Sequence, residues 1–165
     1  MRPFLLVAFA FAAGCTAYRT ARPEAPPINA LGRPPSSLAQ LCVVRPGWGA
    51  RVVTLTVHDN DKLVGATNGP SYFCYFAEPG QHRIVSSIAD QGILDPPRAL
   101  ALTVEPGGRY YLQQSVSPAG HSLVSQSGEE AAKQIEGCGY QIVIRAPDGT
   151  AVPGLTPVAA ASRRP

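Results

Sequence analysis

Short runs of alternating apolar and polar residues fill the middle of the chain, and turn residues separate them. The run 99–105, for example, places Leu100, Leu102 and Val104 on one face and small or polar residues on the other. A repeat of two residues is typical of a β-strand that is buried on one side. We therefore expect strands at 41–45, 50–58, 62–66, 71–77, 81–89, 99–105, 109–116 and 141–145.

The segments between these runs carry the residues that tight turns require. Pro-Gly pairs stand at 46–47, 79–80 and 106–107, and residues 59–62 read Asp-Asn-Asp-Lys. Asp and Asn tolerate a left-handed backbone and hydrogen-bond to their own chain. Seven or eight short strands with such turns between them predict an all-β fold, namely an antiparallel β-sandwich of the immunoglobulin or transthyretin type.

One segment near the C-terminus has a helical pattern instead. Residues 127–130 read Ser-Gly-Glu-Glu and fit a capping box, in which Ser127 accepts from the Glu130 amide and Glu130 reaches back. An apolar face then follows at Ala131, Ala132, Ile135 and Cys138, with Gly137 as the stop signal. The pattern predicts one short C-terminal helix.

The first fifteen residues differ from the rest of the chain. Arg2 precedes an apolar run from Pro3 to Ala13, and small residues lead to Cys15. A bilayer span takes roughly 20 apolar residues, so this shorter run indicates an export signal rather than a transmembrane helix. The frame around Cys15 resembles the lipobox of bacterial lipoproteins, in which the preceding segment is removed and the cysteine is acylated.

This resemblance implies a signal peptide at 1–14, acylation of Cys15 and attachment to the membrane through the N-terminal lipid. In lipoprotein sorting, the lack of Asp after the cysteine favours the outer membrane, and Thr16 stands there. We expect a lipid-anchored protein of the bacterial outer membrane that faces the periplasm. The alternative is cleavage after Ala17, which would release a soluble protein, but residues 15–17 are a poor small-residue pattern.

Composition changes on both sides of the strand-rich region. Five prolines stand between Pro23 and Pro35, with few large apolar residues among them. Such a segment buries too little surface to offset its ordering entropy, so 15–37 is predicted to be a lipidated cysteine followed by a Pro-rich tether. The tail 147–165 is similar, and we expect it to be disordered. The β-sandwich domain is therefore 38–146.

The net charge of +3 does not indicate a nucleic-acid partner. Residues 38–146 contain eight Lys and Arg against nine Asp and Glu, so the positive surplus lies outside the predicted domain. Binding to nucleic acid needs basic residues clustered on the folded surface. We expect no nucleic-acid partner.

If Cys15 is acylated, an odd number of cysteines remains in an oxidising compartment. One disulfide and one free thiol are expected among Cys42, Cys74 and Cys138, and the sequence leaves all three pairings open. The alternative is three buried thiols that act as small apolar groups. No CxxC pair or His/Cys spacing indicates a metal or redox site, so we expect no metal and no cofactor.

Five short motifs follow one another between Leu41 and Cys138. They are Arg45-Pro46, Val57-His58-Asp59-Asn60, Gly69-x-Ser71-Tyr72-Phe73, Pro79-Gly80-x-His82 and Gly107-Gly108-Arg109-Tyr110-Tyr111. Together they resemble a family of bacterial lipoproteins built on a domain of unknown function, and the fourth motif is also similar to PEGA-type surface sandwiches. In those relatives the positions of Cys42 and Cys74 are apolar and β-branched. The presence of both cysteines here favours a Cys42–Cys74 disulfide.

The resemblance implies a fold and a location but no catalytic residues. Ser71, His82 and Asp90 would make a catalytic triad on paper, yet no nucleophile elbow or oxyanion motif accompanies them. The His58-Asp59-x-Asp61 segment has too few oxygens for a calcium loop. We therefore expect that the protein is not an enzyme.

Aromatic residues give the remaining candidate site. The rings able to stack on a sugar or a peptide are Trp48, Tyr72, Tyr75, Tyr110 and Tyr111. The alternative is that these rings fill the core. The sequence thus favours a monomeric binding or envelope-assembly module with an envelope protein or a glycan as partner. A passive structural lipoprotein is the second interpretation, and an enzyme is the third.

Overall fold

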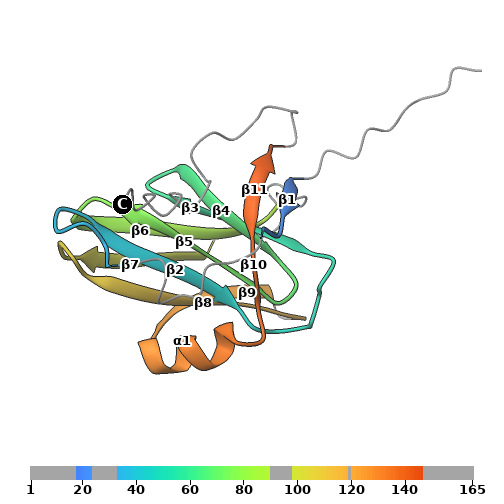
Figure 1. Ribbon diagram of the computed structural model, residues 1–165. Coiled ribbons are helices and arrows are strands. Elements are labelled where there is room, and N and C mark those ends of the chain that lie inside the picture. Colours follow the sequence, from blue (N-terminus) through green and yellow to red (C-terminus); the bar gives the residue numbers. More distant parts are fainter. Residues whose placement is uncertain (1–17, 24–32, 90–97, 119, 147–165) are drawn as a thin grey trace, which may run out of the picture.

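Two β-sheets pack face to face in the computed structural model, and one short helix lies on the outer face of the larger sheet (Figure 1). The structure describes residues 18–23, 33–89, 98–118 and 120–146. The larger sheet has the order β10 (Gly139–Tyr140), β5 (Ser71–Ala77), β2 (Ala39–Arg45), β8 (Arg109–Ser117) and β9 (Gly120–Gln126). The smaller sheet has the order β4 (Lys62–Asn68), β3 (Thr54–Asp59), β6 (Gly80–Ile88) and β7 (Arg98–Val104). The remaining elements are the pair β1 (Arg19–Ala21) and β11 (Ile142–Arg145) and the helix α1 (Gly128–Ile135).

The prediction of an all-β sandwich with one short C-terminal helix is confirmed. The described residues contain eleven strands instead of seven or eight, because the sequence pattern does not predict β1, β9 and the two-residue β10. Two pairings are parallel, β2 with β8 and β10 with β5, where the sequence predicts antiparallel pairing throughout. The chain crosses from one sheet to the other after β2, β4, β5 and β7. As a result, β8 begins at the same end of the larger sheet as β2 and runs parallel to it.

Strand β9 shows why the pattern missed an element. His121 falls outside every strand that the sequence predicts, but it lies on β9 with 3% of its surface exposed. Its Nε2 atom is 2.9 Å from the Ser86 carbonyl oxygen in the opposite sheet. A strand that buries a histidine and is otherwise rich in serine carries little hydrophobic periodicity, which is the signal that strand prediction uses.

Strand β1 falls within the predicted tether. Arg19–Ala21 pair antiparallel with β11, and the Gln141 Nε2 donates to Thr20 Oγ1 at 2.7 Å. The Arg22 guanidinium donates to the Asn68 carbonyl oxygen at 3.0 Å. The described residues 18–23 are therefore attached to the sandwich, which differs from the prediction of a tether running unbroken to residue 37.

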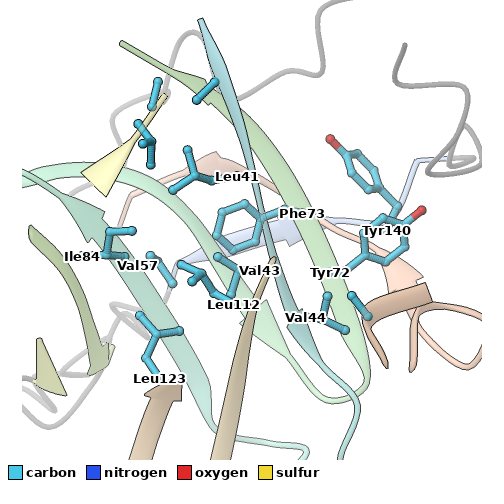
Figure 2. Packing of buried hydrophobic residues seen from close by; sticks show 14 residues of the cluster. Leu41, Val43, Val44, Val57, Tyr72, Phe73, Ile84, Leu112, Leu123 and Tyr140 are labelled. Atoms are coloured by element: carbon cyan, nitrogen blue, oxygen red, sulfur yellow. The ribbon is translucent and has the colours of Figure 1, made fainter. Parts of the chain in front are cut away.

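The core forms where the inner faces of the two sheets meet. Leu41, Val43 and Leu112 from the larger sheet lie opposite Val57 and Ile84 from the smaller one, and all five are fully buried (Figure 2). Along β7 the predicted alternation is confirmed, because Leu100, Leu102 and Val104 are more buried than the residues between them. Burial of side chains of this size contributes about 1.5–3 kcal/mol each.

The Phe73 ring completes this core by lying against the backbone of β4. A Cβ atom at Gly65 would lie 2.3 Å from the Phe73 ring, which is closer than real Cβ atoms approach any neighbour. Glycine at position 65 therefore makes room for the Phe73 ring.

Polar side chains also join the sheets inside the sandwich. Gln114 on β8 accepts a hydrogen bond from Thr67 on β4 through its Oε1 atom and donates to Ser86 on β6 through its Nε2 atom. Gln114, Thr67 and Ser86 are each fully buried. Because every bond in this chain crosses from one sheet to the other, it fixes their relative position as well as satisfying buried groups.

Helix α1 has the predicted capping box. Ser127 accepts from the Glu130 amide at 3.2 Å, and the Glu130 carboxylate accepts from the Ser127 amide. Ala131 is fully buried against the larger sheet, whereas Ala132 is exposed, which corrects its predicted place on the apolar face. The helix lies over β2 and β8 and covers that part of the outer face.

The Cys42–Cys74 disulfide is present as the family resemblance implies. The two cysteines stand directly opposite each other on β2 and β5, with Cα atoms 4.1 Å apart. Between them the chain leaves the larger sheet, forms the β3–β4 hairpin and returns.

Cys138 is the remaining free cysteine among the described residues. Its thiol is half-buried and donates to the Arg45 carbonyl oxygen at 3.6 Å. Burial raises the pKa of Cys138 to about 11, although the charge of Arg22 acts in the opposite direction.

We predict that replacing both Cys42 and Cys74 by alanine lowers the free energy of unfolding by about 3–4 kcal/mol, since the crosslink restricts the unfolded chain over a separation of 32 residues. Urea unfolding of the oxidised protein and of the double variant measures the difference. Cys138→Ala is the matched control and should cost only about 1 kcal/mol. Equal stability of the double variant and the wild type would contradict the prediction.

Candidate functional site

Acidic residues occupy the turns at one end of the sandwich, which also carries Lys62, Arg83 and Arg109, whereas the charged residues described at the other end are arginines. The acidic end consists of the β3–β4, β5–β6 and β7–β8 turns, which contribute Asp61, Glu78 and Glu105, together with Asp59 at the end of β3. The arginine end consists of the 46–53 loop, the β4–β5 turn and the β1–β11 pair. Each end contains one candidate site.

At the acidic end, Asp59 joins the two sheets. Its carboxylate accepts a hydrogen bond from the Tyr75 hydroxyl of β5 at 3.1 Å, and both of its oxygens lie 2.8 Å from His82 Nδ1 of β6. The other ring nitrogen of His82 lies 2.8 Å from the Glu78 carbonyl oxygen. Asp59 is only 7% exposed, so these contacts replace the water that a carboxylate would otherwise bind.

The partners of His82 determine its protonation state. A carboxylate and a carbonyl only accept hydrogen bonds, so His82 satisfies both when each ring nitrogen carries a proton. Burial alone would lower the pKa of His82, but the bonds to Asp59 and Glu78 and the charge of Asp59 outweigh it and leave the pKa above its usual value. His82 and Asp59 thus form a buried ion pair.

Tyr75 completes the cluster as a donor. Burial of its phenol, followed by the charge of Asp59 and the hydrogen bond to it, raises the pKa of Tyr75 well above its usual value. The hydroxyl therefore stays protonated and keeps donating to the carboxylate.

An open hollow of about 540 Å³ lies beside this cluster. Its floor includes Asp59, Tyr75 and His82, and its rim includes the exposed Lys62 and Gln81. Ligand sites in proteins commonly measure about 300–1,000 Å³ and combine apolar surface with a few fixed polar groups. The hollow falls within this size range and is open to solvent, so it offers a surface for a small polar ligand or for one segment of a larger partner.

At the arginine end, a buried arginine holds the 46–53 loop. Arg45 is 1% exposed, and its guanidinium donates to the carbonyl oxygens of Val53 at 2.7 Å and Ala50 at 2.8 Å. Two longer bonds reach Gly49 in the same loop and Thr67 in the smaller sheet. Burial lowers the pKa of Arg45, but a guanidinium remains charged in proteins, so the carbonyl dipoles stabilise a permanent cation.

Apolar side chains of this loop point to solvent. Trp48 is 68% exposed and Val52 is 84% exposed, and the Arg51 guanidinium lies 5.7 Å from the centre of the Trp48 ring. Trp48 thus stands exposed on this loop.

The predicted aromatic surface is not one surface. Tyr72 is 3% exposed and packs edge to face on Tyr140, with ring centres 5.2 Å apart, so its prediction as a binding residue is wrong (Figure 2). Tyr111 lies under α1 against Gly128. Tyr110 is half-buried and accepts from the Glu105 amide at 2.8 Å. Of the predicted set, Tyr75 borders the hollow and Trp48 is exposed at the opposite end.

The residues considered for catalysis are also separated. Ser71 begins β5 at the arginine end, whereas His82 lies at the acidic end, roughly 20 Å away at the rise of a strand. Asp90 lies outside the described residues. Within the part of the chain that the structure describes, no group of three His, Cys, Asp or Glu side chains is placed to hold a metal ion.

Sequence reasoning missed the pairing of Asp59 with His82. It treated Asp59 as part of a turn and His82 as a strand residue. The alternation of apolar and polar residues along the two strands does, however, indicate that both side chains face inward. It also missed Arg45, which it treated only as the end of a strand. No local pattern signals a buried arginine whose acceptors are loop carbonyls.

No protein-family model matches this chain, and no curated protein is significantly similar to it. The resemblance to bacterial lipoproteins therefore stays a prediction from the sequence. In the described ranges the single α-helix, α1, has eight residues and is both too short and too polar to cross a bilayer.

We predict that the stabilising effect of His82 decreases as the pH rises. Its pKa is raised in the folded state, so the contribution is complete below the unfolded value of about 6.5 and is lost as the pH rises through the folded pKa. The wild type should therefore exceed His82→Gln in free energy of unfolding by more at pH 6 than at pH 9, roughly the interval that spans histidine titration. Urea unfolding at both pH values measures this difference.

His58→Gln is the matched control. Burial is the main influence on His58 and lowers its pKa, while Asp61 opposes this shift, so His58 destabilises the folded state at low pH. Its replacement should help stability at pH 6 and change little at pH 9. A difference between wild type and His82→Gln that did not depend on pH would rule out the ion pair.

Proposed function

We propose that this chain is a lipid-anchored protein of the bacterial outer membrane, facing the periplasm, and that its sandwich binds an envelope protein or a glycan. The observation that carries the proposal is the N-terminal sequence, with Arg2, the apolar run 3–13 and the small residues before Cys15. Acyl chains on Cys15 would hold the protein firmly, because each buried methylene contributes about 0.8 kcal/mol.

The disulfide supports this location. Disulfides form and persist in oxidising compartments such as the periplasm and are rare in the cytosol. The Cys42–Cys74 bond lies within the sandwich and closes a long segment of chain, as a structural disulfide does. It is the kind of crosslink that an exported protein acquires.

The hollow at the acidic end supports binding rather than catalysis. A general base needs a free nitrogen or oxygen within reach of the proton that it removes. Both ring nitrogens of His82 are occupied, and the Asp59 carboxylate is shared between His82 and Tyr75. The polar groups of the hollow thus shape a surface instead of supplying a reactive atom.

Cells grown with radioactive palmitate test the anchor. The wild type should carry label and sediment with membranes, whereas Cys15→Ser should carry none, because serine cannot take the thioether-linked lipid. Cys138→Ser, which changes a cysteine outside the lipobox, should label like the wild type. Unlabelled wild type, or label that survives Cys15→Ser, would overturn the proposal.

Photo-crosslinking in cells tests the binding site. A photoreactive phenylalanine in place of Gln81, which is exposed at the rim of the hollow, should give a discrete adduct of higher mass. The same residue in place of Ala132, exposed on α1, is the control and should give none. Adding Lys62→Trp to the Gln81 variant fills the hollow and should reduce the adduct at least about tenfold, the effect of losing 1.4 kcal/mol of binding.

Equal adducts at positions 81 and 132 would contradict the binding site and favour a passive structural role. The same conclusion would follow if filling the hollow left the adduct at position 81 unchanged.

A further inference from the structure

We propose that the loop 46–53 is a second membrane contact, which places its exposed Trp48 and Val52 in the headgroup region of an anionic phospholipid bilayer. This inference rests on the proposed anchor at Cys15 and goes beyond it, because it assigns an orientation to the domain and a ligand class to a surface. The occupant of that surface is a lipid layer of negative charge.

The side chains of the loop fit the interface of a bilayer. Tryptophan concentrates at membrane surfaces, where its ring is apolar and its N–H group stays near water. Val52 adds an apolar side chain that has almost no contact with the protein. Arg51 lies over the Trp48 ring and supplies a positive charge at the same place.

The loop is held in this shape by the domain. Its carbonyl groups at 49, 50 and 53 all accept from the buried Arg45, and the Val53 amide donates to the Ala50 carbonyl oxygen at 2.8 Å. Exposure of Trp48 is therefore a property of an ordered loop. A rigid loop loses little conformational entropy when it meets a surface, which favours binding.

Strand β1, which follows the proposed anchor in the sequence, and the loop 46–53 lie at the same end of the sandwich. A Cβ atom built on Gly69 would lie 3.6 Å from the Arg51 Cβ and 3.8 Å from a guanidinium nitrogen of Arg22, so the N-terminal segment and the loop flank one turn. In Figure 1, β1 stands at the end where the β2–β3 connection returns. Cys15 precedes Arg19 by four positions in the sequence, a reach of at most about 14 Å.

The short distance between Cys15 and β1 along the chain limits how far the domain can lie from the membrane. A tether that ran to residue 37 would let the domain stand tens of ångströms from the membrane. Because β1 is paired with β11, an acylated Cys15 would instead hold the arginine end close to the headgroups.

Charge favours an anionic surface at this end. Arg19 and Arg145 stand opposite each other on β1 and β11, and Arg22 and Arg51 lie beside the β4–β5 turn. Neither described segment, 18–23 or 46–53, contains Asp or Glu, and none of these four arginines forms an ion pair within the described residues. Each basic residue near an anionic membrane contributes about 1 kcal/mol, or roughly a fivefold change in the contact equilibrium.

Trp48 is the single tryptophan of the chain, so its fluorescence reports on the loop directly. The mature lipidated protein is purified and reconstituted into vesicles of phosphatidylethanolamine and phosphatidylglycerol. Phospholipids brominated on the acyl chains are the quencher. We expect a blue-shifted emission and strong quenching. We expect Arg51→Gln to lower the equilibrium constant for contact between the loop and the membrane by about fivefold.

The control moves the reporter to another exposed surface. A Trp48→Phe/Val124→Trp protein carries its tryptophan on β9, at a position that is 49% exposed and lies outside the loop. That protein should be quenched little. Equal quenching of the two reporters, or quenching of Trp48 that is as strong in pure phosphatidylcholine vesicles, would overturn the inference.

Mass spectrometry of the same purified protein separates the two proposals. Absence of acyl chains would mean that the proposed anchor fails. Acyl chains together with an unquenched Trp48 would mean that the anchor stands and the membrane contact of the loop is wrong.

Discussion

Much of this structure depends on one buried cation. Arg45 ends the central strand of the larger sheet, and carbonyl oxygens of the 46–53 loop and of β4 surround its charge. A charged donor makes stronger hydrogen bonds than a neutral one. Leaving the guanidinium or a buried carbonyl oxygen without a hydrogen-bond partner inside the protein would cost free energy. The guanidinium therefore sets the path of the loop and joins it to both sheets.

At the opposite end of the sandwich, hydrogen bonds to buried charged groups also hold the two sheets together. There the charge is shared between Asp59 and His82, and Tyr75 brings in the second sheet. Between the two ends, Gln114 and His121 add further hydrogen bonds across the core. The sandwich thus combines apolar burial, which is not directional, with polar bonds that fix how one sheet sits on the other. The candidate sites lie at the ends, where buried charged groups hold turns and loops that are themselves exposed.

The sequence predicted most of the sandwich for a clear reason. Val57, Ile84 and Leu102 each stand in a run with a period of two, and that period directly encodes the buried face. The capping box at Ser127 is a local motif and was predicted for the same reason. The parallel pairing of β2 with β8 depends on where the chain changes sheet, which no local pattern records. Tyr72 looked like a surface ring because the sequence could not show that Tyr140 and α1 cover the outer face.

The third thiol of the sandwich has a consequence for how the chain acquires its crosslink. Disulfide exchange proceeds through the thiolate, and a cysteine whose pKa is raised to about 11 supplies very little of it near neutral pH. Cys138 is therefore a slow competitor once its surroundings have formed, and oxidation is directed to the pair that faces each other across β2 and β5. In the folded chain, the register of β2 and β5 thus favours one of the three possible pairings.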